Sequence, residues 1–244
     1  MKISIHKETL NGIKCLQYKH PRAEKLLFLQ HGIHSKKENV MNLYGITLAK
    51  LGYNIIALDA YKHGERIEEP FISKEDDQCT LETMDVVKHT AYDIKAIYEN
   101  HFKDRYKTFD FIGISMGGMI AYYLSTITKH IDQLVALISS PQFLETANYV
   151  FPLKRQQVHQ EQSQNVIKEL KNIDPSTRTE HMHFHRLIML NGKHDNVIPA
   201  NQSQRFYEDH PDLPIMFKLY DTDHKVNQAM FEDLQDLLKE SFRS

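Results

Sequence analysis

The sequence has few cysteines and little excess charge of either sign. Its two cysteines, Cys15 and Cys79, lie far apart and form no C-x-x-C pattern, which argues against a disulfide framework and against a zinc site. The formal net charge is −2, and acidic and basic residues are interspersed along the chain. This composition gives no electrostatic reason to expect a nucleic acid or an anionic membrane surface as a partner.

Long apolar segments are also missing. No apolar run approaches the roughly 20 residues that span a bilayer, and Met1–Leu10 lacks the apolar core of about 7 to 15 residues that marks a signal peptide. We therefore expect a cytoplasmic protein with reduced thiols and no membrane insertion. Repeats, low-complexity tracts and linkers are absent as well, so residues 1–244 are expected to form a single α/β domain.

Patterns of buried strands and amphipathic helices alternate along most of the chain. Asn11-Gly12 between two short alternating runs is typical of a β-hairpin, which predicts an antiparallel edge to a larger sheet. The alternation after it predicts a mostly parallel eight-stranded sheet with helices on both faces. Strands are expected at residues 3–6, 13–18, 25–30, 53–59, 108–112, 134–139, 187–191 and 215–220. Helices are expected at residues 39–51, 83–102, 119–124, 199–209 and 228–242, with a polar loop at 60–81.

The hexapeptide Gly113–Gly118 joins a predicted strand to a predicted helix and contains the pattern G-x-S-x-G. In a nucleophile elbow this pattern exposes a serine hydroxyl at the tip of a tight turn. The glycines leave room for neighbouring backbone, and the helix N-terminus directs free N–H groups at the site. Ser115 is therefore the candidate nucleophile. The alternative is an ordinary serine in a glycine-rich turn, because short motifs also match by chance.

A serine hydroxyl needs a base, and the base needs an orienting carboxylate. Functional groups of parallel α/β sheets gather where the strands end, so the base and the carboxylate are expected directly after predicted strands. Asp195 follows the strand at 187–191, and His224 follows the strand at 215–220. Of the residues around it, only His224 can act as a base near neutral pH. The alternatives are a turn or helix-capping role for Asp195 and a surface position for His224.

The chain order Ser115, Asp195, His224 resembles that of the α/β-hydrolases. The match also includes His31-Gly32 after the third strand and the segment G-x-x-D-x-x-I-P around Asp195. The chain therefore resembles, over nearly its whole length, the serine esterases of the prolyl-oligopeptidase and dienelactone-hydrolase-like group. This resemblance implies an α/β-hydrolase fold with a small helical cap.

The same resemblance implies roles for further residues. The backbone N–H groups of Ile33 and Met116 correspond to the family's oxyanion hole. His31 is expected to be structural, and His34 is expected to lie at the site entrance. The cap is expected at about residues 142–184, where it would shape the substrate pocket. The apolar residues expected to form the wall of this pocket are Phe143, Leu144, Tyr149, Phe151 and Leu153.

Three other features favour structural explanations. The segment Asp59–Arg66 resembles a D-x-x-x-H-G-x-R segment of some bacterial esterases of this group. We favour a turn, with the aspartate capping and the arginine paired with a carboxylate, over a substrate contact. His181, His183 and His185 would share one face of a strand, but no carboxylate or cysteine cluster accompanies them, so no metal site is predicted. Cys79 is expected to be inert.

Together these residues predict a serine hydrolase, most specifically a carboxylesterase that cleaves small acyl esters through an acyl-enzyme. Ser115 would attack the carbonyl, His224 would transfer the proton and Asp195 would orient the imidazole. No metal or organic cofactor is required. The alternatives are a thioesterase or small peptidase of the same fold and, from another class, a non-catalytic ligand-binding protein on the same scaffold. The natural ester and the oligomeric state stay open.

Overall fold

The structure is a computed structural model. It describes the whole chain apart from residues 1, 68–75, 151–159, 241 and 243–244.

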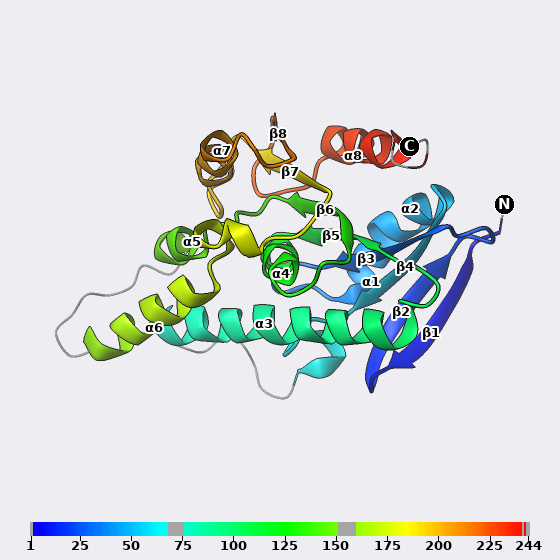
Figure 1. Cartoon of the computed structure of the whole chain (residues 1–244), viewed down its shortest axis with the longest axis horizontal. Helices are drawn as coiled ribbons and strands as arrows, with labels where there is room; N and C mark the ends of the chain where they lie inside the picture. The colour runs from blue at the N-terminus through cyan, green and yellow to red at the C-terminus, as the bar shows by residue number, and fades with distance from the viewer. Residues whose placement is uncertain (1, 68–75, 151–159, 241, 243–244) are drawn as a thin grey trace.

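An eight-stranded sheet runs through the middle of the described chain, in the order β1-β2-β4-β3-β5-β6-β7-β8 (Figure 1). β2 is antiparallel to both β1 and β4, and all other neighbouring strands are parallel. The predicted mostly parallel sheet with an antiparallel edge is therefore confirmed. The strands are β1 (Ser4–Leu10), β2 (Ile13–Lys19), β3 (Lys25–Gln30), β4 (Tyr53–Leu58), β5 (Phe109–Ile114), β6 (Ile131–Leu137), β7 (Arg186–Gly192) and β8 (Ile215–Tyr220).

Helices cover both faces of this sheet. None of those that the structure describes is long and apolar enough to cross a bilayer. They are α1 (Lys37–Val40), the π-helical turn η1 (Met41–Gly45), α2 (Ile46–Lys50), α3 (Asp76–His101), α4 (Met116–Ser125), α5 (Phe143–Val150), α6 (Gln160–Ile173), α7 (Ala200–Asp209) and α8 (Gln228–Glu240). Short 3-10 turns occur at η2 (Gly64–Arg66), η4 (Pro175–Thr177) and η5 (Thr179–His181).

Two hydrophobic cores form, one on each face of the sheet. Residues of α3, α4 and α6 contribute to one core, and residues of α2 and α8 contribute to the other. Figure 1 shows α3 and α8 on opposite sides of the strands. The central strands are buried from both sides, which explains why β3 and β7 read as continuous apolar runs.

The hairpin between β1 and β2 forms as its Asn-Gly dipeptide predicts. Asn11 has φ 50° and Gly12 has φ 80°, and these are the residue types that adopt left-handed conformations most readily.

Two helices differ from the boundaries expected from the sequence. The helix expected at 39–51 is divided into α1, η1 and α2. At Gly45, within η1, an added Cβ would lie 2.9 Å from the Tyr18 ring, so the close approach of the helix to β2 requires glycine there. α3 begins at Asp76, inside the segment expected to be a loop. The first turn of α3 is polar and carries no apolar stripe from which a helix could be predicted.

Candidate active site

Ser115 occupies a tight turn between β5 and α4. Its backbone has φ 55° and ψ −116°, which is strained for a non-glycine residue, and its N–H donates to the carbonyl of Leu137 at 2.9 Å. A Cβ on Gly113 would lie 2.0 Å from the carbonyl oxygen of Gly117, and a Cβ on Gly117 would lie 2.5 Å from that of Gln30. Both positions of the motif therefore require glycine.

The loops after β7 and β8 bring Asp195 and His224 to the serine. His224 Nε2 lies 2.9 Å from Ser115 Oγ, and His224 Nδ1 lies 2.7 Å from Asp195 Oδ2. Because an ionised carboxylate can only accept, His224 Nδ1–H donates to Asp195. Nε2 is then the acceptor of the serine hydroxyl. The imidazole is thus in the tautomer that can take a proton from Ser115.

Both oxygens of the buried Asp195 carboxylate have partners. Oδ1 accepts hydrogen bonds from the N–H groups of Val197 (2.9 Å) and Ile198 (2.8 Å), and Oδ2 accepts from His224. Oδ1 therefore has the turn-capping role that was the alternative for Asp195, while Oδ2 binds the imidazole. The same hydrogen bonds fix the direction in which the carboxylate faces His224.

The loop after β3 packs against the serine turn. A Cβ on Gly32 would lie only 3.3 Å from Ser115 Cβ. The next residue in this loop is Ile33, and Met116 is the first residue of α4. Within the part of the chain that the structure describes, neither the Ile33 N–H nor the Met116 N–H has an intramolecular acceptor. Both donors are therefore available to a ligand.

His31 is fully buried and links two loops. Its Nδ1–H donates to the carbonyl of Gly32 (2.7 Å), and its Nε2 accepts from the N–H of Ala60 (3.0 Å). Burial lowers the pKa of His31 to about 4, so the ring is uncharged at neutral pH. These contacts give His31 the structural position that the sequence predicts.

An apolar cavity of about 510 Å³, part of it open to solvent, lies beside Ser115. No charged side chain lines it among the residues that the structure describes. Its walls come from α3, α4, α5 and the loops after β3 and β7. The residues that line it are Ile33, Thr80, Thr83, Met84, Ser115, Met116, Met119, Thr146, Ala147, Val150, Val197 and Ile198.

In the described part of the chain, the pocket residues expected from the sequence do not line this cavity. His34 is exposed, and Tyr149, half exposed, lines a different hollow. Phe143 is fully buried, and Leu144 packs against the same core. Phe151 lies outside the described residues, as does the rest of the segment 151–159.

The orientation of α5 explains why the expected residues do not line this cavity. Thr146, Ala147 and Val150 face the cavity, and the hydroxyl of Thr146 donates to Gln202 Oε1 on α7 at 2.7 Å. Phe143, one turn earlier, points into the core instead. On α5 the core takes the large side chain and the cavity takes the smaller ones, whereas the sequence alone favours large apolar residues for a pocket wall.

Several cavity residues were missed in the sequence. Met119 could have been found, because it lies one residue after the glycines of the elbow, at the start of α4. Thr80 gives no such signal, because it lies in the segment 60–81, which the sequence predicts to be a loop although α3 begins within it. Thr83 and Met84 were expected in a helix, but its rotation toward the site depends on tertiary packing.

The segment after β4 turns around the buried carboxylate of Asp59. Asp59 accepts hydrogen bonds from the backbone N–H groups of Lys37 and Glu65, each at 2.9 Å. Arg66 Nη2 forms an ion pair with Asp93 Oδ2 at 2.7 Å. These contacts correspond to the structural alternative favoured by the sequence.

The three histidines between 181 and 185 do not lie on a strand. His181 ends η5, and His183 and His185 precede β7. His185 Nδ1 lies 2.9 Å from Asp132 Oδ1. In the described ranges, no group of three or more His, Cys, Asp or Glu side chains is arranged to hold a metal ion.

The sequence matches a family and a curated relative. A sequence profile described as "Uncharacterised protein family (UPF0227)" matches residues 62–239. The chain is also 22% identical over 180 residues to the protein "Esterase YjfP" of Escherichia coli (strain K12). That match covers 73% of this chain and 71% of the relative.

Solved structures share the architecture at low sequence identity. TT1662 from Thermus thermophilus is similar over 100% of both chains, with a TM-score of 0.80 and 22% identity. The Pyrococcus furiosus esterase Pf2001 is similar over 99% of this chain and 92% of its own, with a TM-score of 0.66 and 19% identity. These likenesses show the fold alone, and it is the α/β-hydrolase fold expected from the sequence.

Proposed function

Because the chain belongs to the uncharacterised protein family UPF0227 and has the α/β-hydrolase fold, we propose that it is a serine hydrolase, more specifically a carboxylesterase that cleaves small acyl esters. One observation carries the proposal. Ser115 Oγ, His224 and Asp195 form a hydrogen-bonded series with distances of 2.9 Å and 2.7 Å. The three residues come from loops after three different strands, and the similarity to an esterase supports the same chemistry.

Acylation begins when Ser115 Oγ attacks the ester carbonyl and His224 Nε2 takes the hydroxyl proton. Asp195 accepts from Nδ1–H and stabilises the imidazolium that forms. The tetrahedral intermediate collapses when its C–O bond to the alcohol breaks, and His224 returns the proton to the departing alkoxide. The acyl group is left as an ester of Ser115.

Deacylation repeats the sequence with water as the nucleophile. His224 Nε2 removes a proton from water, the hydroxide attacks the acyl carbonyl, and the proton then passes to Ser115 Oγ as the acid leaves. In the tetrahedral intermediate of each half-reaction the former carbonyl oxygen carries a negative charge. We assign the stabilisation of this charge to the N–H groups of Ile33 and Met116. Donors of this kind are worth about 3 to 4 kcal/mol each in the transition state.

The apolar cavity is the proposed acyl pocket. Ser115 lines it together with methionine, alanine, valine, isoleucine and threonine side chains. Such a lining favours a neutral, apolar acyl group, because an ionised group would lose its hydration without gaining a partner. Substrates with a charged acyl end are therefore expected to react poorly.

Two alternatives remain within the fold, and one lies outside catalysis. A thioesterase or a small peptidase would use the same three residues on a different leaving group. A non-catalytic ligand-binding protein would have no need for a serine held in hydrogen-bond contact with an imidazole. That contact therefore favours an enzyme.

Labelling with a fluorophosphonate probe tests the class. We expect the wild-type protein to label and Ser115→Ala not to label. Ser139→Ala is the matched control, because Ser139 is also buried after a strand and its hydroxyl has no partner in the described chain. It should label like the wild type. Absence of wild-type labelling, or equal labelling of Ser115→Ala, would contradict a serine hydrolase.

Substrates that share one acyl group test the subclass. The butyryl p-nitrophenyl ester, a butyryl thioester and a butyryl p-nitroanilide differ only in the leaving group. We expect the highest kcat/KM for the ester. A higher kcat/KM for the thioester would contradict a carboxylesterase and favour a thioesterase. A higher value for the anilide would favour a peptidase. A second series from acetyl to dodecanoyl esters, with a hemisuccinyl ester included, would measure the depth and polarity of the pocket.

A further inference from the structure

A buried lysine lies outside the proposed catalytic residues but adjoins the loop that carries the Ile33 N–H. Lys37, the first residue of α1, is only 2% exposed. Its Nζ lies 2.7 Å from Asp59 Oδ2 and 2.6 Å from Glu65 Oε2. Lysine is rarely buried unless it is paired, and a buried ion pair adds little net stability over an apolar replacement. The pair is therefore better explained by the position that it imposes on the loop before Lys37 than by a gain in stability.

Asp59 is the centre of this cluster. It is 1% exposed, and it accepts from the backbone N–H of Lys37, the Nζ of Lys37 and the N–H of Glu65. Burial would raise the pKa of the Asp59 carboxyl, but the hydrogen bonds and charge of Lys37 hold it below its usual range. Burial likewise acts to lower the pKa of Lys37, and its carboxylate partners raise it above the ordinary value. Both groups are therefore charged at neutral pH.

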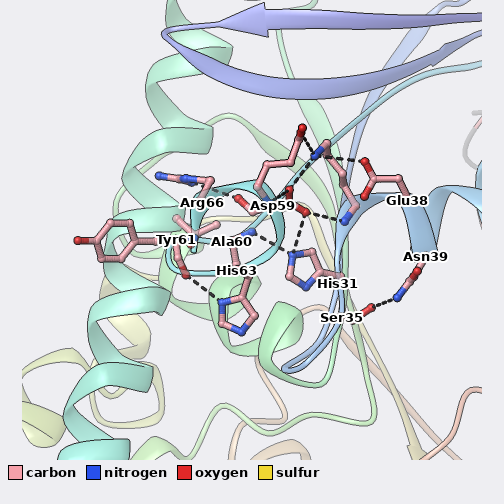
Figure 2. A network of polar contacts seen from close by, with 12 residues as sticks. His31, Ser35, Glu38, Asn39, Asp59, Ala60, Tyr61, His63 and Arg66 are labelled. Atoms are coloured by element: carbon pink, nitrogen blue, oxygen red, sulfur yellow. Dashed lines mark hydrogen bonds and ion pairs between the residues drawn. The ribbon is translucent and has the colours of Figure 1, made fainter. Parts of the chain in front are cut away.

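The loop after β3 is attached to the segment after β4 at both of its ends. At its start, the His31 ring accepts from the N–H of Ala60, the residue directly after Asp59. At its end, the backbone and the side chain of Lys37 both bind Asp59. Figure 2 shows His31 beside Asp59 and Ala60. Residues 31–37 are therefore held at two points by two consecutive residues.

The Ile33 N–H lies between these two attachment points. On the serine side the loop has no spare room, because a Cβ on Gly32 would lie 3.1 Å from the carbonyl oxygen of Ile114. His34 has φ 58°, a conformation that persists in a non-glycine residue only where its surroundings enforce it. The loop is thus confined between the Ser115 turn and the Asp59 cluster.

We propose that Lys37 is a positioning residue which, paired with Asp59, holds residues 31–37 so that the Ile33 N–H faces the developing oxyanion. The inference rests on the proposed function, in which this N–H stabilises the tetrahedral intermediate. Lys37 itself touches no reacting atom. Its effect falls on the transition state more than on substrate binding, because an oxyanion donor is needed most when the charge has developed.

The test is Lys37→Met, which keeps an unbranched side chain one heavy atom shorter than lysine and removes the charge. With p-nitrophenyl butyrate we expect kcat to fall about 10- to 100-fold, less than the roughly 100- to 1,000-fold loss on removing a donor outright. KM should change less than about threefold. The affinity of an alkyl trifluoromethyl ketone, which forms an oxyanion adduct with the serine, should fall in parallel with kcat.

Lys14→Met is the matched control. Lys14 is exposed and binds the other carboxylate oxygen of Glu65, at 3.2 Å. The same substitution there should leave kcat and ketone affinity unchanged. Lys37→Arg, which restores a cation beside Asp59, should recover most of the lost kcat. A merely structural role for Lys37 would lower the thermal midpoint and leave kcat per folded molecule at the wild-type value, which would overturn the proposal.

Lys37→Met leaves Asp59 without its cation and can fail to fold for that reason. The double variant with Asp59→Asn added removes both charges, and it should show the same loss of kcat. A folded double variant with wild-type kcat would also overturn the proposal. If the wild-type protein neither labels with the fluorophosphonate nor turns over an ester, the proposed function has failed instead, and the two failures are thereby distinguished.

Discussion

The carboxyl and amino ends of the parallel strands differ in how often the backbone has a positive φ at a non-glycine residue. At the carboxyl end, each of β3, β4, β5 and β6 is followed within four residues by a non-glycine residue of positive φ. These residues are His34, Lys62, Ser115 and Ile138. In the described chain, the remaining non-glycine residue of this kind is Asn11, in the hairpin turn. At the amino end of the parallel strands the described backbone has none.

The amino end instead buries a carboxylate whose two oxygens both accept hydrogen bonds. Asp110 Oδ1 accepts from the N–H of Gln133 (3.1 Å), and Oδ2 accepts from the hydroxyl of Tyr53 (2.6 Å) and from Gln133 Nε2 (3.2 Å). Burial raises the pKa of Asp110 to about 6. A perturbed carboxyl group is a common indicator of an active site, but the hydrogen-bond partners of this one in the described chain are a tyrosine and a glutamine.

The comparison shows that burial of a carboxylate does not by itself identify chemistry. Asp195 and Asp110 are both buried, and both oxygens of each accept hydrogen bonds. The difference lies in the partners. Asp195 holds a titratable imidazole that reaches a strained serine, whereas Asp110 holds side chains that cannot relay a proton near neutral pH. Strained backbone and available donors occur at the same end of the sheet as the proposed catalytic residues.

The largest expected effect comes from the same substitution at the two ends. In Asp195→Asn the amide would still accept from the backbone of Val197, but its N–H₂ group would face His224 and favour the wrong tautomer. We expect kcat for p-nitrophenyl butyrate to fall about 10⁴-fold. Steady-state kinetics at pH 7.5 measures this.

Asp110→Asn is the matched control, because it removes the charge of an equally buried carboxylate at the other end of the sheet. Its kcat should stay within about twofold of wild type, since the rigid sheet keeps Asp195 and His224 in place. A comparable loss of kcat in both variants would show that the substitutions act through the fold, and the contrast between the two ends would fail.

The positions of the three proposed catalytic residues could be predicted because a parallel sheet places consecutive strand ends on one edge. Ser115, Asp195 and His224 each follow an apolar run that is easily recognised, and their meeting needs only the order of the strands. The fold could be predicted because its signals are local. Hydrophobic periodicity indicates the strands and helices, and the Asn-Gly dipeptide indicates the hairpin turn.

The apolar cavity beside Ser115 could not be predicted, because its lining depends on how α3 and α5 rotate and pack. Whether Phe143 or Thr146 faces the cavity is decided by how a two-turn helix rests on the core. Thr80 lies on a helical turn that resembles a loop in the sequence. The pairing of Lys37 with Asp59 is equally hidden, because nothing in the sequence distinguishes this lysine from the many solvated ones.

An intermediate effect is expected in the pH dependence of stability. The folded-state pKa of Asp110, about 6, lies above its ordinary value of 3.8. The stabilisation linked to its protonation is therefore fully present below pH 3.8 and is lost as the pH rises through about 6. The shift corresponds to about 3 kcal/mol. Asp110→Asn should lack this loss, so its stability relative to wild type should increase by that order between pH 3.8 and 7.

Urea unfolding of both proteins across this range measures the difference. Comparison with the variant is necessary because His31 acts in the opposite direction. Its pKa is lowered from 6.5 to about 4, so its contribution is present above pH 6.5 and is lost as the pH falls toward 4. That contribution is common to both proteins and cancels in the difference. Parallel pH profiles for the two proteins would contradict the raised pKa of Asp110.

The smallest effect is expected from single hydroxyl groups. Tyr53→Phe removes one donor from Asp110 while Gln133 retains two, so the free energy of unfolding should fall by about 1 to 2 kcal/mol, with kcat unchanged. Tyr122→Phe is the matched control, because the Tyr122 hydroxyl is buried without a hydrogen-bond partner in the described chain. Removing an unpaired buried hydroxyl costs nothing in hydrogen bonding, so this variant should be as stable as wild type or slightly more stable. Equal losses of unfolding free energy in the two variants would mean that the Tyr53 hydroxyl contributes through packing alone. The hydrogen bond to Asp110 would then add nothing to stability, which would contradict the role given to this network at the amino end.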